Sequence, residues 1–174
     1  MSIGEFTAAI VSKLTESVFQ IQIVGDLKWA GFHKDLIYHT HISKRSIYGY
    51  PDLHAIRRSI DPIPAWVTYK KPRQIYAELK TEKGTATIEQ VLWLDALADQ
   101  RDHGNPALEV YLIRPSDRDA FRDVLLHGPK QPGGLAQWPT GQEETRRKAR
   151  PTRPGTPGVK PRKRRKKTLA GGIR

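Results

Sequence analysis

The chain has 174 residues, enough for one folded domain with an appendage. It contains no cysteine, which excludes disulfides, thiolate metal sites and cysteine nucleophiles. The formal net charge of +12 comes entirely from residues 128–174, because residues 1–127 hold 16 Lys/Arg and 16 Asp/Glu. No apolar run is long enough to span a membrane and no signal-peptide core is visible, so we expect a soluble intracellular protein without a membrane partner.

The predicted elements alternate between helical and strand periodicity. Apolar residues at three- and four-residue spacing predict a first helix that begins at Thr7 or Thr15 and ends at Ala30. Short β-branched, aromatic or alternating runs predict four strands, over about 35–42, 52–58, 73–81 and 108–114. Two further helices are predicted over about 88–101 and 121–127. The order α-β-β-β-α-β-α favours an α/β fold in which an antiparallel meander and a parallel crossover form a mixed sheet with helices on its faces.

The composition changes near Gly128. The residues after it are rich in Pro, Gly, Lys and Arg and contain few apolar side chains, so we predict a folded domain over 1–128 and a disordered basic tail over 129–174. A run of cations near the end of the tail is typical of a nucleic-acid tether or of a nuclear localisation signal. We favour the tether, with these expected DNA contacts: Arg162, Lys163, Arg164, Arg165, Lys166 and Lys167.

Four polar residues lie near the ends of predicted elements in a pattern that suits metal chemistry. Glu78 and Lys80 are two apart on a predicted strand, so both side chains leave the same face of the sheet. Asp52 opens the neighbouring strand after Pro51, so pairing of the two strands would bring two carboxylates together. Two hard oxygen ligands, with substrate phosphate and water, match the preference of Mg²⁺. Such a metal can lower the pKa of a water and stabilise charge on a scissile phosphate.

Lys80 and Gln90 would complete this candidate site. Lys80 would compensate the clustered negative charge and could orient or deprotonate the attacking water, while Gln90 could hydrogen-bond the water or the phosphate. Structural interpretations stay open for each residue. Glu-x-Lys pairs commonly form salt bridges on strands, Pro-Asp marks turns, and Gln90 could complete a capping box with Thr87.

The same segments resemble a known family. The runs GYPDLHAI, YAELKTEKGTATIEQVLWLDAL and EVYLIRPSD look like the VRR-NUC domain (virus-type replication-repair nuclease). The resemblance covers about Thr15 to Leu126 and includes TESVFQIQIV with WAGF and the approach THISKRSIYGYPDL. Because that family belongs to the PD-(D/E)XK superfamily, the resemblance implies a restriction-endonuclease-like αβββαβ core.

The resemblance also implies a function and a set of site residues. It implies an Mg²⁺- or Mn²⁺-dependent deoxyribonuclease that hydrolyses DNA phosphodiester bonds. The metal would be held by two acids and a backbone carbonyl, with a further acid nearby: Asp52, Glu78, Leu79 and Glu16. The catalytic residues would be Asp52, Glu78, Lys80 and Gln90. For Glu16 a second interpretation stays open, since an acidic residue also complements the dipole at a helix N-terminus.

Small stand-alone members of the family are similar to phage proteins that act as homodimers on branched DNA such as four-way junctions. The resemblance therefore implies DNA as a partner, a homodimer, a structure-selective role in replication, recombination or repair, and a location in the cytoplasm of a bacterial host. The basic tail makes this chain longer than the minimal domain, so the resemblance does not fix its substrate preference.

Other polar and aromatic residues have more than one interpretation. Lys44 and Arg45 could contact phosphate, although a solvated loop explains them equally well. His39 and His41 share a predicted strand face, but no third ligand of convincing spacing accompanies them, so we expect them to face the cleft or DNA and not to bind zinc. We expect three tryptophans to be core or interface residues: Trp29, Trp66 and Trp93.

Three functions compete at this level. The leading hypothesis is a metal-dependent DNA endonuclease. The alternative is a catalytically inactive DNA-binding accessory protein on the same scaffold, and the third is a small basic RNA-binding protein in which only the tail matters. The intact set of Asp, Glu and Lys argues against the inactive protein, because such a protein has no reason to hold like charges near one another.

Overall fold

A four-stranded mixed sheet forms the centre of the molecule. The computed structural model describes residues 15–39, 47–130 and 134–142. The strands run in the order β1-β2-β3-β4, with these bounds: β1 Ile37–His39, β2 Leu53–Arg57, β3 Arg73–Leu79 and β4 Leu108–Ile113. The β1–β2 and β2–β3 pairs are antiparallel and the β3–β4 pair is parallel, which confirms the expected meander and crossover.

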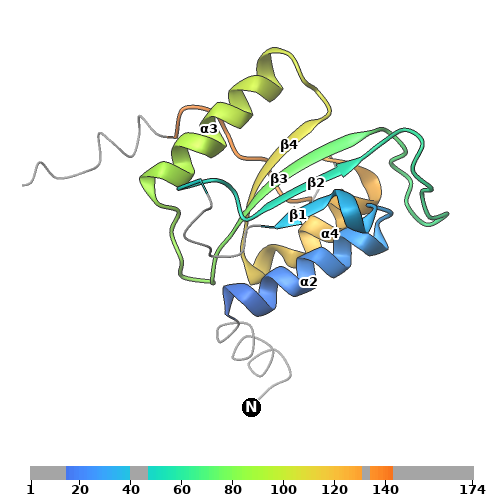
Figure 1. Ribbon diagram of the computed structural model, residues 1–174, viewed down its shortest axis with the longest axis horizontal. Helices are drawn as coiled ribbons and strands as arrows, with labels where there is room; N and C mark the ends of the chain where they lie inside the picture. Colours follow the sequence, from blue (N-terminus) through green and yellow to red (C-terminus); the bar gives the residue numbers. More distant parts are fainter. Residues whose placement is uncertain (1–14, 40–46, 131–133, 143–174) are drawn as a thin grey trace, which may run out of the picture.

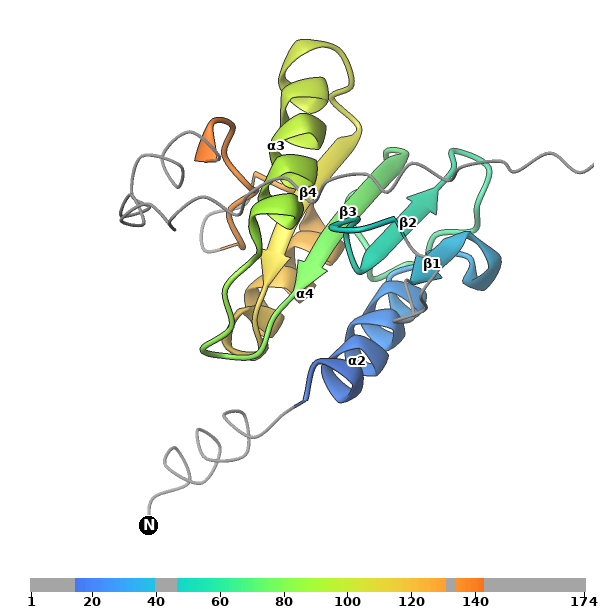
Figure 2. The same cartoon turned by 60° about the vertical axis from the view of Figure 1, so that its left-hand side comes forward.

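Helices cover both faces of the sheet (Figures 1 and 2). They are α2 Glu16–Trp29, α3 Ile88–His103 and α4 Arg118–His127, with short 3-10 turns at Lys34–Leu36 and Pro115–Asp117. The helices α2 and α4 lie on one face, and α3 lies on the other. The mixed α/β architecture expected from the sequence is therefore present among the described residues.

Side-chain caps explain where two of the helices begin. The hydroxyl of Thr15 accepts from the backbone N–H of Val18, so of the two expected starts Thr15 is the one that begins α2. Residues 7–14 lie outside the described part of the chain. Thr87 caps α3 in the same way and forms a full capping box with Gln90.

Strand alternation divides the core into two clusters. Ile75, Ala77 and Leu79 of β3 face α2 and α4 and belong to the larger apolar cluster. The intervening residues of β3, among them Tyr76, face the side of α3, where a smaller cluster lies. We call this second side the α3 face. Because Glu78 is two residues from Tyr76 in the strand, it also belongs to the α3 face.

Part of the segment expected to be disordered packs against the domain. Within residues 134–142, Leu135 contacts the larger apolar cluster and Trp138 contacts the smaller one. The backbone N–H of Trp138 donates to the carbonyl of Val110 at 2.7 Å, and its indole N–H donates to Asp95 Oδ1 at 2.6 Å. The expectation of disorder was wrong here, because two isolated apolar residues find a partner surface beside β4. Residues 131–133 and 143–174 lie outside the described part.

None of the helices in the described ranges combines the length and apolar character that a membrane crossing requires.

Candidate functional site

Asp52 and Glu78 converge at one end of the β2–β3 ladder. The register pairs Leu53 with Ala77, and continuing it by one residue places Asp52 opposite Glu78. The carboxylate Oδ2 of Asp52 accepts a hydrogen bond of 2.9 Å from the backbone N–H of Leu79. Two acids that are 26 positions apart in the chain therefore lie side by side on the α3 face, as the sequence pattern predicts.

Glu78 is fully buried, and its two carboxylate oxygens have different surroundings. Its Oε1 lies 2.6 Å from Nζ of Lys80 and also accepts a hydrogen bond from Nε2 of Gln90. Its Oε2 is buried and has no hydrogen-bond partner among the described residues. A buried carboxylate oxygen without a donor costs free energy, so this atom is a place where a cation or a proton would be stabilised.

The electrostatics of the pair follow from this geometry. Burial raises the pKa of Glu78 to about 8, and the negative charge of Asp52 adds to the effect, whereas Lys80 acts in the opposite direction. Burial also raises the pKa of Asp52, against the lowering effect of the Leu79 N–H and of Lys80. Two ionised carboxylates here are therefore unfavourable, because one ammonium does not offset both. Either a proton shared in the hydrogen bond between Asp52 and Glu78 or a further positive charge would remove the conflict.

Lys80 links the pair to the start of α2. Its side chain is only 9% exposed, and Nζ lies 3.9 Å from Oε1 of Glu16 as well as close to Glu78. Glu16 is half-exposed in the first turn of α2 and raises the pKa of Asp52 by its charge. Both interpretations of Glu16 are thus compatible with its position, since it complements a helix N-terminus and also lies at the edge of the site.

Gln90 likewise satisfies both of its interpretations. Its side-chain Oε1 accepts from the backbone N–H of Thr87 at 2.8 Å, which closes the capping box. Its Nε2 donates to Glu78, so one amide joins the helix cap to the buried carboxylate. The structure thus brings the four expected catalytic residues together: Asp52, Glu78, Lys80 and Gln90.

The loop before Asp52 is held by contacts with α3 and α2 that the sequence does not predict. Gly49 has φ +80°, and a Cβ there would lie 2.6 Å from the backbone carbon of Glu89 in α3. Only glycine combines this left-handed conformation with such a close approach. On the other side, the amide of Gln20 donates to the backbone carbonyl of Asp52 at 3.4 Å. The spacing of Gln20 on α2 carries no signal that would have revealed this contact.

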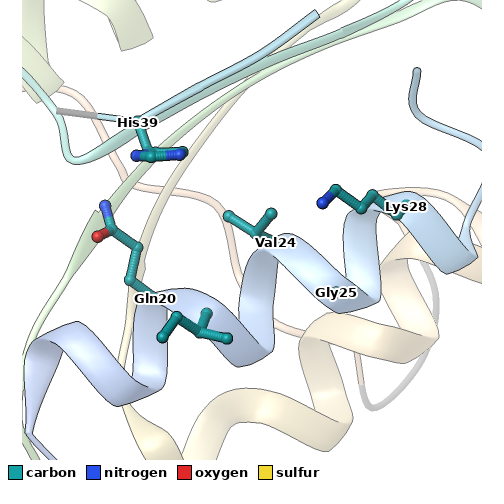
Figure 3. A pocket seen from close by; sticks show the side chains of 6 residues that line it. Gln20, Val24, Gly25, Lys28 and His39 are labelled. Atoms are coloured by element: carbon teal, nitrogen blue, oxygen red, sulfur yellow. The ribbon is translucent and has the colours of Figure 1, made fainter. Parts of the chain in front are cut away.

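A pocket of about 390 Å³ lies between α2 and the end of β1 (Figure 3). It is lined by Gln20, Ile21, Val24, Gly25, Lys28 and His39. The imidazole of His39 points from β1 toward α2 and lies above Gln20 in this view. His39 therefore lines this pocket and does not lie with the carboxylate pair on the α3 face. His41, Lys44, Arg45 and residues 162–167 of the tail lie outside the described residues.

The tryptophans occupy different surroundings. Trp29 and Trp66 stack on each other with ring centroids 6.0 Å apart, and both remain more than a third exposed. Trp93 packs edge-on against Tyr50 at 5.2 Å, in the loop that leads to Asp52. Trp93 is half-buried and belongs to neither core cluster, and the other two form an exposed pair, so none of the three is a core residue.

The donor set fits a hard divalent cation. Two carboxylates, one of which has a buried oxygen without a donor, suit Mg²⁺, because this ion keeps several waters and takes only one or two carboxylates from a protein. Among the described residues, no group of three or more His, Cys, Asp or Glu side chains is placed to hold a metal. The two carboxylates alone therefore do not make an all-protein metal cage.

Comparison of the chain with protein-family models, with curated proteins and with solved structures finds no match.

Proposed function

We propose that the protein is a metal-dependent endonuclease that hydrolyses DNA phosphodiester bonds on a restriction-endonuclease-like version of the α/β fold. The observation that carries this proposal is the pairing of half-buried Asp52 with buried Glu78 beside the ammonium of Lys80, with one Glu78 oxygen that has no hydrogen-bond partner among the described residues. Such a pair is unstable as two free anions, and a bound cation removes the conflict.

Each residue has a distinct role in the proposed reaction. Asp52 and Glu78 would hold Mg²⁺ or Mn²⁺, together with the expected carbonyl of Leu79, and Glu16 would lie beside them. The cation would supply Lewis-acid stabilisation of the charge that develops on the phosphate. Lys80 would orient the attacking water as an ammonium, or, as a neutral amine that has given up its proton, would accept a proton from that water. Gln90 would keep the Glu78 carboxylate in place.

The charge distribution supports a polyanionic substrate. The whole excess of +12 follows Gly128, while residues 1–127 are balanced. A cationic tail attracts DNA by counterion release and carries little sequence information. Selectivity would then come from the shape of the substrate at the site, in keeping with the branched DNA that the resemblance implies.

The test is a cleavage assay with the full chain. Labelled four-way junction, flap, nicked and plain duplex DNA are incubated with Mg²⁺, with Mn²⁺ and with EDTA. We expect cleavage that EDTA abolishes, and that falls by at least about a hundredfold in Asp52→Asn, Glu78→Gln and Lys80→Ala, since each removes a group that acts in the transition state.

Asp99→Asn is the matched control, because it is the same acid-to-amide change at an exposed position on α3. It should cleave like the wild-type chain. DNA retention without cleavage in any metal would favour the inactive accessory protein. Cleavage that survives in both Asp52→Asn and Glu78→Gln would refute the proposed site.

A further inference from the structure

A row of aromatic side chains crosses the α3 face beside the carboxylate pair. The register pairs Tyr38 of β1 with His54 of β2, and His54 with Tyr76 of β3. The imidazole of His54 lies flat on the ring of Tyr76, with centroids 4.1 Å apart and planes 9° apart. His54 lies two residues after Asp52 in β2, and Tyr76 lies two residues before Glu78 in β3. Two residues are a step of about 7 Å along a strand, and both side chains are then on the same face.

One end of this aromatic row is accessible. Tyr76 belongs to the apolar cluster beneath α3, His54 is half-buried, and Tyr38 on the outermost strand is 57% exposed. The helix α3 lies over β3 and β4 (Figures 1 and 2). Among the described residues, no helix covers the β1 and β2 part of this face. The row therefore runs from the core to solvent within reach of the candidate site.

Hydrogen bonds hold the buried end of the row. The amide nitrogen of Gln74 lies 3.2 Å from Nε2 of His54 and donates to the hydroxyl of Tyr76 at 3.0 Å. The hydroxyl of Tyr50 hydrogen-bonds that of Tyr76, and burial with the neighbouring phenols of Tyr76 and Tyr38 raises the pKa of Tyr50 to about 12. The rings of His54 and Tyr76 are thus held in place, and the row combines flat π faces with polar groups.

We propose that Tyr38 and His54 form a stacking surface for unpaired DNA bases next to the cleavage site. This inference rests on the proposed function and names the feature of DNA that the site prefers. A nucleobase has a flat π face and polar edges, and aromatic side chains stack on it whatever its identity. An apolar protein or lipid surface would cover the hydroxyl of Tyr38 without offering it a hydrogen-bond partner. The net charge of +12 also favours a polyanion.

The test places a reporter base on the row. The full chain is mixed in EDTA with DNA that carries 2-aminopurine either in a short unpaired flap or within a perfect duplex. Raised KCl weakens the contribution of the basic tail. We expect the wild-type chain to quench the flap probe by stacking. Tyr38→Ala should lose the quenching and bind the flap at least about fivefold more weakly, while Tyr38→Phe stays within about twofold.

Trp66→Ala is the matched control. Trp66 is 54% exposed, similar to Tyr38, and lies in the loop beyond the other end of the β2–β3 ladder. This variant should quench and bind like the wild-type chain, and thermal unfolding of all variants checks that each is folded.

The outcomes separate this inference from the proposed function. Absence of quenching by the wild-type chain, or a Tyr38→Ala variant that quenches as the wild type does, overturns the stacking surface. Equal weakening of flap and duplex binding in Tyr38→Ala also overturns it. If the wild-type chain quenches the flap probe but never cleaves DNA with Mg²⁺ or Mn²⁺, the nuclease proposal fails and the binding surface survives.

Discussion

The side-chain amide of Gln90 connects the first turn of α3 to the buried carboxylate of Glu78. Its oxygen accepts from the backbone of Thr87 and its nitrogen donates to Glu78. Both ends of the amide are therefore used, which fixes its orientation and that of the carboxylate. A residue that the sequence presents as either a helix cap or a site residue acts as both.

Two alanine variants separate these contributions. We expect Gln90→Ala to lower the free energy of unfolding by about 1–2 kcal/mol and to reduce cleavage, because the cap and the Glu78 contact are both lost. Thr87→Ala should cost about 1 kcal/mol but preserve cleavage, because the Gln90–Glu78 contact remains. Urea denaturation and cleavage rates measure the two effects. Equal loss of cleavage in both variants would mean that Gln90 acts only through the helix cap.

The raised pKa of Glu78 makes stability depend on pH. Its ordinary value is 4.5 and its value in the folded chain is about 8. Between these values the unfolded chain releases a proton that the folded chain keeps. The free energy of unfolding therefore falls as pH rises, by at most about 1.4 kcal/mol per unit, and this contribution ends above the folded value. The pKa of Asp52 shifts in the same direction.

Glu78→Gln has no proton to release at this position. Its free energy of unfolding should therefore fall less than that of the wild-type chain over the same range. Urea denaturation at several values from about pH 5 to 9 measures both profiles. Parallel profiles would contradict the raised pKa.

Substitution by alanine should destabilise the protein far more at Gly49 than at Gly25. A methyl group at Gly49 would meet the backbone of Glu89 in a left-handed conformation, so Gly49→Ala should cost about 2 kcal/mol or more and shift the loop that carries Asp52. Gly25 lies within α2, and a Cβ there meets no atom within 4 Å. Gly25→Ala should therefore be neutral or stabilise by up to about 1 kcal/mol. Thermal unfolding and cleavage rates are measured for both variants. Equal effects of the two substitutions would show that Gly49 does not hold the loop that carries Asp52.

Trp138 should contribute to stability although it lies beyond the predicted domain. A chain that ends at residue 142 keeps the contacts of Trp138 with Val110 and Asp95, and should unfold like the full chain. Trp138→Ala in the full chain should lose about 2 kcal/mol, less than a fully buried tryptophan would. Guanidinium denaturation measures both. An unchanged midpoint for Trp138→Ala would show that the segment does not contribute to folding stability.

Local patterns predicted much of the fold and the convergence of the acids. Alternation with a period of two places Glu78 and Lys80 on one face, and short connections favour antiparallel neighbours. Because Asp52 opens a strand of this meander, its approach to Glu78 follows from strand pairing alone. The positions of the Thr15 and Thr87 caps are also local properties, since a hydroxyl three residues before an amide suffices.

Other features depend on contacts between distant segments. Trp138 is an isolated aromatic residue in a Pro- and Gly-rich stretch, and its packing requires the β4 edge and Asp95. Arg73 is fully buried because Glu109 from β4 neutralises it at 2.6 Å, a pairing 36 residues apart. The Glu78 oxygen without a donor is likewise a result of three-dimensional packing, and no sequence pattern encodes it.

Binding of Mn²⁺ in the absence of DNA tests the central claim most directly. Calorimetric titration of the full chain in two buffers of different ionisation enthalpy reports the affinity and the protons released. We expect saturable binding at the Asp52–Glu78 pair, with release of a proton near neutral pH because Glu78 must ionise. The binding should disappear in Asp52→Asn and Glu78→Gln and persist in Asp99→Asn. Absence of saturable binding by the wild-type chain, or equal binding by all three variants, would contradict the account.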